Sequence, residues 1–273
     1  MTMGKRIAFI GGGNMASAII GGLIRHGYAA SQIDVVEPWL DARERLQKDY
    51  GVVAQPQAGA FLAAADMVVW AVKPQTFKEA AQQVRAHNTR ALHLSVAAGI
   101  RSNSIAAWLG TERIIRTMPN TPALIGKGMT ALFARPAVTA ADKAWAGEVI
   151  GTTGAFLWLT AEDQLDAVTA ISGSGPAYMF YFMEAMTDAG AQMGLDRAQA
   201  YQLAVATFIG AGELARASTE PPETLRAKVT SKGGTTYAAI TSMDESGIKA
   251  AFEKALFAAQ KRATELGSEF GGS

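Results

Sequence analysis

The stretch Ile7-Ala-Phe-Ile-Gly-Gly-Gly-Asn-Met-Ala16 decides the fold of this chain. A short apolar run leads into glycines, and a helical pattern, Asn14–His26, follows them. Gly11, Gly13 and Ala16 fit the G-x-G-x-x-G/A pattern that binds a dinucleotide between a first strand and a helix. The first glycine permits a tight turn, the second lets the backbone approach a pyrophosphate, and the alanine lets helix and strand pack closely. Glycines also serve ordinary turns, so the surrounding pattern must decide.

The sequence around this loop alternates between short apolar runs and helical patterns. The candidate strands are Arg6–Ile10, Ile33–Val36, Met67–Val72, Ala91–Val96, Arg113–Thr117, Met129–Ala134 and Ala155–Leu159. The candidate helices are Asn14–His26, Asp41–Tyr50, Phe61–Ala65, Gln75–Ala86, Arg101–Leu109 and Ala140–Thr152. Such alternation requires crossover connections and a mainly parallel sheet, and continuously apolar strands are covered on both faces. We therefore predict an α/β, doubly wound sheet in residues 1–160, with a dinucleotide at its first strand–helix junction.

Residues 161–273 lack strand patterns and predict a second, all-helical domain. Apolar side chains recur at helical spacing, as between Met179 and Met186, and breakers such as Gly233-Gly234 separate the helices. The stretch from Ser172 to Gly194 carries only two charges. A helix that is apolar most of the way round needs cover, which a second subunit or the chain's own core can supply. We predict a homo-oligomer, and a frayed end at Gly271–Ser273.

The composition excludes several classes of site. The chain has 25 basic and 24 acidic residues, and a net charge of +1 produces no overall electrostatic attraction for nucleic acid or an acidic membrane. It has no cysteine, and its three histidines are not at metal-ligand spacing, so we predict neither a thiol nucleophile nor a metal. No apolar stretch reaches the roughly 20 residues of a membrane span, and none suits a signal peptide. We expect a soluble, cytoplasmic protein.

Loops at the carboxyl ends of the strands should face one crevice. They are Ala71-Val-Lys-Pro74, Val96-Ala-Ala-Gly99 and Met118-Pro-Asn-Thr-Pro122. Glu37 ends the second predicted strand, where an acid accepts a hydrogen bond from a ribose 2′-hydroxyl, which favours NAD. Arg43 and Arg45 follow; they could pair with the 2′-phosphate of NADP or lie on a solvated helix face. Lys73 could likewise touch substrate or phosphate, or simply face solvent.

The chain lacks the proton donor that a carbonyl-reducing dehydrogenase uses for the nascent alkoxide. In one class of two-domain dehydrogenases that donor is a Lys on the first long helix of the second domain, yet residues 161–196 contain no Lys, Arg or His. A protonated imine already carries its proton, so it needs only a hydrogen-bonding group near nitrogen and an anchor. The segment Lys228-Val-Thr-Ser-Lys-Gly-Gly-Thr-Thr236 offers a hydroxyl at Thr236 and amides that can hold a carboxylate. A Thr-capped helix start explains the same segment.

The segment Val229-Thr-Ser-Lys-Gly-Gly-Thr-Thr236, continuing to Asp244, resembles the signature of pyrroline-5-carboxylate reductase. The other motifs that match this family in order are Gly11-Gly-Gly-Asn-Met15, Ala71-Val-Lys-Pro-Gln75, Ala97-Ala-Gly99, Met118-Pro-Asn-Thr-Pro122 and Ser172-Gly-Ser-Gly-Pro-Ala177. The resemblance covers nearly the whole chain. It implies reduction of L-1-pyrroline-5-carboxylate to L-proline by NADPH or NADH, the last step of proline biosynthesis. It also implies a Rossmann-like N-terminal domain and an interlocked helical homodimer, with the active site at the dimer interface and dimers that commonly form a decamer.

The resemblance assigns roles to particular residues. Thr236 would be the catalytic residue, bonding the substrate nitrogen, while Ser231, Gly234 and Thr235 would hold the carboxylate. The substrate-binding set is Val229, Ser231, Gly233, Gly234, Thr235 and Thr236. The cofactor-binding set is Gly11, Gly13, Asn14, Met15, Ala16, Glu37, Ala71, Val72, Lys73, Pro74, Val96, Ala97, Ala98 and Asn120.

Three positions depart from the family pattern. Lys232 replaces a frequent Pro, Ala58 replaces an Asn that commonly contacts the adenosine part, and Glu37 replaces small polar residues that tolerate a 2′-phosphate. The choice between NADPH and NADH is therefore open. A dehydrogenase of 3-hydroxy acids or a related ketone reductase, and a dinucleotide-sensing protein without turnover, stand as alternative functions.

Overall fold

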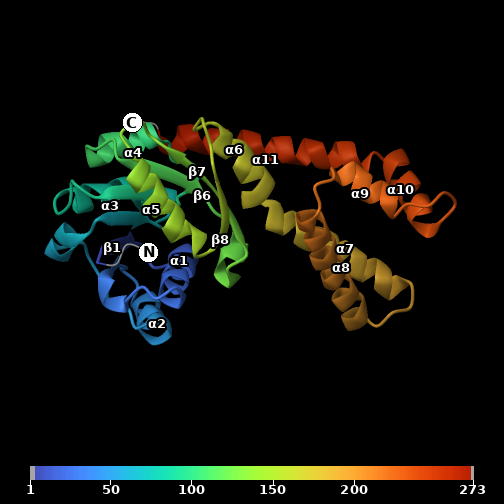
Figure 1. Ribbon diagram of the computed structural model, residues 1–273, viewed down its shortest axis with the longest axis horizontal. Helices are drawn as coiled ribbons and strands as arrows, with labels where there is room; N and C mark the ends of the chain where they lie inside the picture. The colour runs from blue at the N-terminus through green and yellow to red at the C-terminus, as the bar shows by residue number, and fades with distance from the viewer. Residues whose placement is uncertain (1–3, 272–273) are drawn as a thin grey trace. The chain divides into compact units, whose positions relative to one another are not determined.

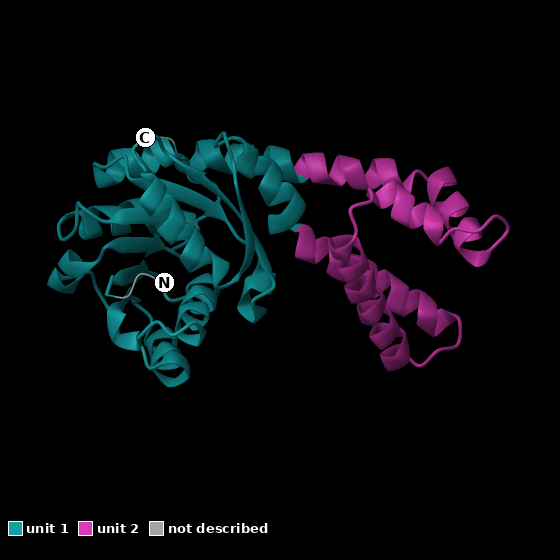
Figure 2. Ribbon diagram, viewed as in Figure 1, with its two compact units in different colours: residues 1–174, 259–273 teal, residues 175–258 magenta. Residues whose placement is uncertain are grey.

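The computed structural model describes residues 4–271, which divide into two compact units (Figures 1 and 2). Unit 1 runs through Ser174 and takes up the chain again from Ala259, and unit 2 comprises Gly175–Ala258. Residues 272 and 273, part of the predicted frayed end, lie outside the described residues.

Unit 1 contains an eight-stranded sheet within residues 4–271, in the order β3-β2-β1-β4-β5-β6-β7-β8. The strands are β1 (Ile7–Ile10), β2 (Ile33–Val36), β3 (Ala54–Gln55), β4 (Met67–Trp70), β5 (Leu92–Ser95), β6 (Ile114–Met118), β7 (Gly128–Ala134) and β8 (Gly154–Trp158). All neighbours are parallel except β6 and β7. The predicted mainly parallel, doubly wound sheet is confirmed. The strand order reverses between β1 and β4, which is where such sheets form a ligand crevice.

Helices connect the strands and cover both faces of the sheet. They are α1 (Asn14–Arg25), α2 (Leu40–Tyr50), α3 (Pro74–Arg85), α4 (Ser102–Leu109), α5 (Ala140–Gly151) and α6 (Gln164–Val168), with 3-10 turns at Ala30–Gln32, Ala60–Ala64 and Thr121–Ile125 and a π-helical turn at Thr169–Gly173. The central strand β4 shows the two layers, because Met67 and Val69 pack with α1, α2 and α5. Val68 and Trp70 pack with α3 and α4 on the other face.

The end of the last helix, α11 (Ile248–Gly271), belongs to unit 1. The Thr264 hydroxyl donates a hydrogen bond to the Asp166 carboxylate (2.9 Å), and the Ser104 hydroxyl donates to the Gly271 carbonyl (3.1 Å). Phe270 packs against the core on the α3 and α4 face. The compact units therefore differ from the predicted domains, because α6 and the last turns of α11 pack with the sheet. The boundary near residue 160 between a nucleotide-binding domain and a helical dimerisation domain stays a prediction.

Unit 2 is helical, as predicted. Its elements are α7 (Gly175–Gln192), α8 (Arg197–Ala217), α9 (Pro222–Lys228), α10 (Thr235–Glu245) and the first part of α11. Large apolar side chains that are more than half exposed include Phe180, Tyr181, Met193, Leu203, Ile209, Leu214 and Phe257. The chain's own core therefore leaves much of this apolar surface uncovered, which favours another subunit over the chain's own core as its cover. No helix within residues 4–271 is long and apolar enough to cross a membrane.

Candidate active site

A cavity of about 760 Å³ opens in unit 1 beside the carboxyl ends of β1, β2 and β4. The predicted cofactor residues that line it are Gly11, Gly13, Glu37, Ala71, Val72 and Lys73. Other lining residues include Pro38, Trp39, Asp41, Ala42, Arg45, Pro56, Ala58, Thr76 and Glu79. The cavity lies where the strand order reverses, so its position is that of a nucleotide crevice in a doubly wound sheet.

The glycine loop has the geometry that its sequence predicts. Gly11 has φ +96°, and a Cβ there would lie 2.5 Å from the carbonyl oxygen of Ala71, so only glycine fits. A Cβ on Gly13 would meet nothing within 4 Å, because the space beside it is open. Helix α1 begins after Gly13 without a side-chain cap, while Ala16 is fully buried against the sheet. The open space and the uncapped amides fit a pyrophosphate.

Glu37 is 6% exposed and lies against the glycine loop. Its Oε2 accepts a hydrogen bond from the Gly12 amide (2.7 Å), and its Oε1 accepts one from the Trp39 amide (2.9 Å). Arg43 does not line the cavity, and its Nη1 donates to the carbonyls of Glu37 (3.0 Å) and Pro38 (2.6 Å). The acid at the end of β2 is thus a fixed part of the cavity wall.

The remaining predicted cofactor residues do not line this cavity. Asn14 borders a smaller hollow beside the glycine loop, and Met15 packs on the core. Pro74 opens α3. Asn120 uses its side chain within the protein, since its amide nitrogen donates to the Ser172 carbonyl (3.1 Å) and its Oδ1 accepts from the Met129 amide (2.9 Å). The segment Val96–Ala98 follows β5 without contributing to the cavity wall.

The predicted substrate residues form one loop in unit 2, between α9 and α10. Gly233 has φ +78°, and Gly234 is the N-cap of α10 without a side-chain hydrogen bond. The expectation of a Thr cap is therefore wrong, because Thr235 and Thr236 are the first two residues of the helix itself and do not occupy the capping position. Within residues 4–271, the hydroxyls of Ser231, Thr235 and Thr236 make no hydrogen bond, and all three residues are exposed.

A buried polar network supports the unit 1 loops, and sequence reasoning missed it. Glu162 accepts hydrogen bonds from the Ser102 amide and hydroxyl (both 2.6 Å), which caps α4, and it pairs with Arg116 (2.6 Å). Burial raises the pKa of Glu162, but the bonds from Ser102 and the charge of Arg116 outweigh burial and lower it. Burial lowers the pKa of Arg116, partly offset by Glu162, and the guanidinium stays charged. Glu162 therefore links β6 to the start of α4.

His93 is a titratable group that forms part of the core of unit 1. His93 is fully buried on β5, and burial lowers the pKa of its imidazole to about 4. Its Nδ1 accepts a hydrogen bond from the Trp70 indole nitrogen (3.1 Å), so the ring is neutral and packed in the core. Residues 4–271 hold no group of three or more His, Asp or Glu side chains that could bind a metal ion.

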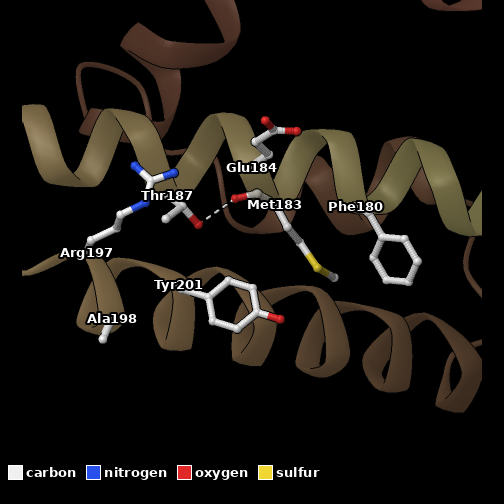
Figure 3. A pocket seen from close by; sticks show the side chains of 7 residues that line it. All are labelled: Phe180, Met183, Glu184, Thr187, Arg197, Ala198 and Tyr201. Carbon is white, nitrogen blue, oxygen red and sulfur yellow. Dashed lines mark hydrogen bonds between the residues drawn. The ribbon is translucent and has the colours of Figure 1, made fainter.

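A second cavity, of about 580 Å³, lies between α7 and α8 of unit 2. Figure 3 shows Met183 and Tyr201 pointing toward the gap between these helices, with the Thr187 hydroxyl donating to the Met183 carbonyl (2.7 Å). Arg197 at one end pairs with Asp188 (2.7 Å). None of the predicted substrate residues lines it. Its walls belong to the same exposed apolar surface of unit 2.

Comparison with known proteins identifies the family. The chain is 45% identical over 268 residues to a pyrroline-5-carboxylate reductase of Pseudomonas aeruginosa, covering 97% of this chain and 98% of that protein. This chain belongs to the pyrroline-5-carboxylate reductase family. The family model for pyrroline-5-carboxylate reductase dimerisation matches residues 162–266, and the model for NADP oxidoreductase, coenzyme F420-dependent, matches residues 6–99. Its activity is therefore the NAD(P)H-dependent reduction of pyrroline-5-carboxylate, in place of the 3-hydroxy-acid and sensor alternatives.

Solved structures agree with this assignment. A pyrroline-5-carboxylate reductase of Coxiella burnetii is 38% identical, with a TM-score of 0.88 and coverage of 96% of this chain and 98% of that chain. The enzyme of Plasmodium falciparum, solved with NADP bound, is 26% identical, with a TM-score of 0.87 and coverage of 97% and 99%. The match to the dimerisation model supports the assembly of this chain into a homo-oligomer.

Proposed function

We propose that this reductase binds the nucleotide in the unit 1 cavity and the carboxylate and nitrogen of L-1-pyrroline-5-carboxylate on residues 229–236. The single observation that supports this division is the substrate loop itself. Its helix begins with uncapped amides, and its three hydroxyls are exposed and without an internal partner among the described residues. A helix N-terminus of this kind attracts a carboxylate, and the unpaired hydroxyls are available to the substrate.

The chemistry needs little from the protein beyond position. When bound, the reduced nicotinamide supplies the hydride that adds to the carbon of the C=N bond. The nitrogen of the protonated imine keeps its proton and becomes the amine of L-proline, so no side chain has to give up a proton. Thr236 accepts a hydrogen bond from the imine N–H, while Ser231, Gly234 and Thr235 hold the carboxylate, with Val229 and Gly233 shaping the loop. Correct orientation supplies much of the rate in such a reaction.

Assembly completes the proposal. The exposed apolar side chains of α7 and α8 and the match to a dimerisation model support a homodimer, and we propose that dimers associate further, as in a decamer. The remaining cofactor contacts, from Asn14, Met15, Pro74, Val96–Ala98 and Asn120, belong to this proposal as well. We place the reaction in the cytoplasm, as the last step of proline biosynthesis.

The test is the variant Thr236→Ala, with Thr236→Ser as its matched control. Oxidation of NADPH and NADH is followed at 340 nm with and without pyrroline-5-carboxylate. A hydrogen bond to a charged group contributes about 1.5–3 kcal/mol, so Thr236→Ala should lower kcat roughly tenfold to a hundredfold. Dissociation constants of both nucleotides should stay unchanged, and Thr236→Ser should recover most of the rate. Turnover of Thr236→Ala at the rate of the unmodified enzyme would remove this hydroxyl from the mechanism.

A further inference from the structure

Trp39 stands out among the five tryptophans of the chain. Its side chain is 77% exposed, whereas Trp70 and Trp145 are buried and Trp108 and Trp158 are half-buried. It also lines the unit 1 cavity, in the turn between β2 and α2. A tryptophan gains little by lying in solvent, and an exposed aromatic ring at a cavity rim is typical of a ligand contact.

The backbone that presents this indole is fixed. The Trp39 amide donates to Glu37 Oε1 (2.9 Å), and the Trp39 carbonyl accepts from the Arg43 amide (3.1 Å). Arg43 also holds the carbonyls of Glu37 and Pro38 through its guanidinium. Pro38 and Pro56 line the same part of the cavity and stiffen it. The indole therefore projects from a turn that is already ordered.

Small side chains also line this cavity. They include Ala42, in the first turn of α2, and Ala58. An exposed indole beside such small side chains is suited to contact with a planar aromatic ring. Stacking between a nucleobase and an aromatic side chain contributes about 1–3 kcal/mol and requires no particular base.

Glu37 determines which ribose substituents the cavity can accept beside the adenine ring. A Cβ on Gly12 would lie 3.2 Å from Cγ of Glu37, so the acid lies flat against the glycine loop. Each of its carboxylate oxygens accepts one backbone amide and keeps a further lone pair. Those lone pairs can accept from ribose hydroxyls. A phosphate on the 2′-oxygen would instead bring a second anion to a carboxylate that cannot turn away.

The other charges of the cavity do not compensate for such a phosphate. Its wall carries three acids, Glu37, Asp41 and Glu79, against two bases, Arg45 and Lys73. Arg45 also borders the smaller hollow formed with Gly12, Gly13 and Asn14, so it lies on the side where the pyrophosphate is expected. Arg43 does not line the cavity, and its Nη1 already donates to two carbonyls.

We propose that Trp39 is the adenine-stacking residue of the cofactor cavity, and that Glu37 makes this cavity select NADH over NADPH. The inference rests on the proposed placement of the nucleotide in unit 1 and adds a binding residue and a preference to it.

Two probes that differ only by the phosphate test it without any turnover. ADP-ribose and 2′-phospho-ADP-ribose are titrated into the full chain by calorimetry, and tryptophan emission is followed with excitation at 295 nm. We expect ADP-ribose to bind at least tenfold more tightly, and to quench emission. Trp39→Ala should weaken ADP-ribose at least fivefold and abolish most of the quenching, while Trp39→Phe retains most of the affinity. Trp108→Phe, outside the cavity, is the matched control and should change neither constant.

The preference is tested by Glu37→Ser, with Glu37→Gln as a second variant of closer shape. Both remove the charge, so the ratio of the two dissociation constants should fall toward one. Equal or tighter binding of the 2′-phosphate by the unmodified protein would overturn the preference. Unchanged affinity and quenching in Trp39→Ala would overturn the stacking role, as would failure of ADP-ribose to bind. Loss of turnover with pyrroline-5-carboxylate, with these constants intact, would count against the proposed function alone.

Discussion

Removing the charge of Glu162 should destabilise the protein strongly, because Arg116 would remain buried without a partner. Arg116 is 5% exposed, and its Nη1 lies 2.6 Å from Glu162 Oε1. Breaking a buried ion pair by losing one partner costs about 3–5 kcal/mol. Glu162→Gln keeps an acceptor for the Ser102 amide, so the lower end, about 3 kcal/mol, applies. In a chain of this size each kcal/mol lowers Tm by roughly 2–4 °C, so Tm should fall by roughly 6–12 °C.

A double-mutant cycle separates the pair from its surroundings. Tm is measured by circular dichroism at pH 7 and one protein concentration, because the assembled state depends on concentration. The double variant Arg116→Met/Glu162→Met should lose far less stability than the two single variants lose in sum, because an apolar pair can replace a buried ion pair at little cost. Glu213→Gln breaks the exposed pair with Arg216 and should leave Tm unchanged. Additive losses, or a Tm of Glu162→Gln within about 1 °C of the unmodified protein, would refute the reasoning.

Three further outcomes are expected. The pKa of Glu162 lies below its usual value in the folded protein, so the stabilisation from its carboxylate is present above about pH 4.5 and is lost as the pH falls through the folded pKa. When the pH is lowered from about 5 to about 3, the Tm of the unmodified protein should therefore fall further than the Tm of Glu162→Gln in parallel melts. Gly11→Ala forces a Cβ against the Ala71 carbonyl and should lower Tm by several degrees. Gly13→Ala places its Cβ in open space, so this variant should keep the Tm of the unmodified protein but bind ADP-ribose more weakly. A larger loss of Tm in Gly13→Ala than in Gly11→Ala would contradict the roles of the two glycines. Light scattering at micromolar concentration should show no main monomer, given the exposed apolar surface of α7 and α8, and a monomer peak would refute the predicted assembly.

The sequence predicted those parts of unit 1 that follow from periodicity. Apolar runs buried on both faces, such as Met67–Trp70, are strands because only a covered parallel sheet suits them. The strand β3, of two residues, shows no such period and was missed. The last turns of α11 have a clear helical pattern, but their packing on α4 depends on contacts between residues far apart in the sequence, such as Ser104 with Gly271, which no local pattern encodes.

The candidate site was predictable where a residue acts through its backbone and less so where it acts through its side chain. Gly11 and Gly13 could be assigned because their roles follow from the lack of a Cβ. The acid at the end of β2 could be placed, but its two bonds to the Gly12 and Trp39 amides could not, and these decide which way the carboxylate faces. Asn120 was expected beside the cofactor, yet its amide holds two backbone groups of its own unit.

The absence of basic side chains in residues 161–196 and the exposed hydroxyls of residues 231–236 have one chemical explanation. A ketone reductase must supply a proton to an alkoxide, so it needs an acid whose pKa is tuned near the working pH. A protonated imine brings that proton with it, and a neutral hydroxyl then suffices to orient the nitrogen. A lysine there would place a second positive charge against the imine and oppose binding. In the proposed site, no side chain therefore has to give a proton to the substrate nitrogen, and Ser231, Gly234 and Thr235 at the start of α10 would hold the substrate carboxylate.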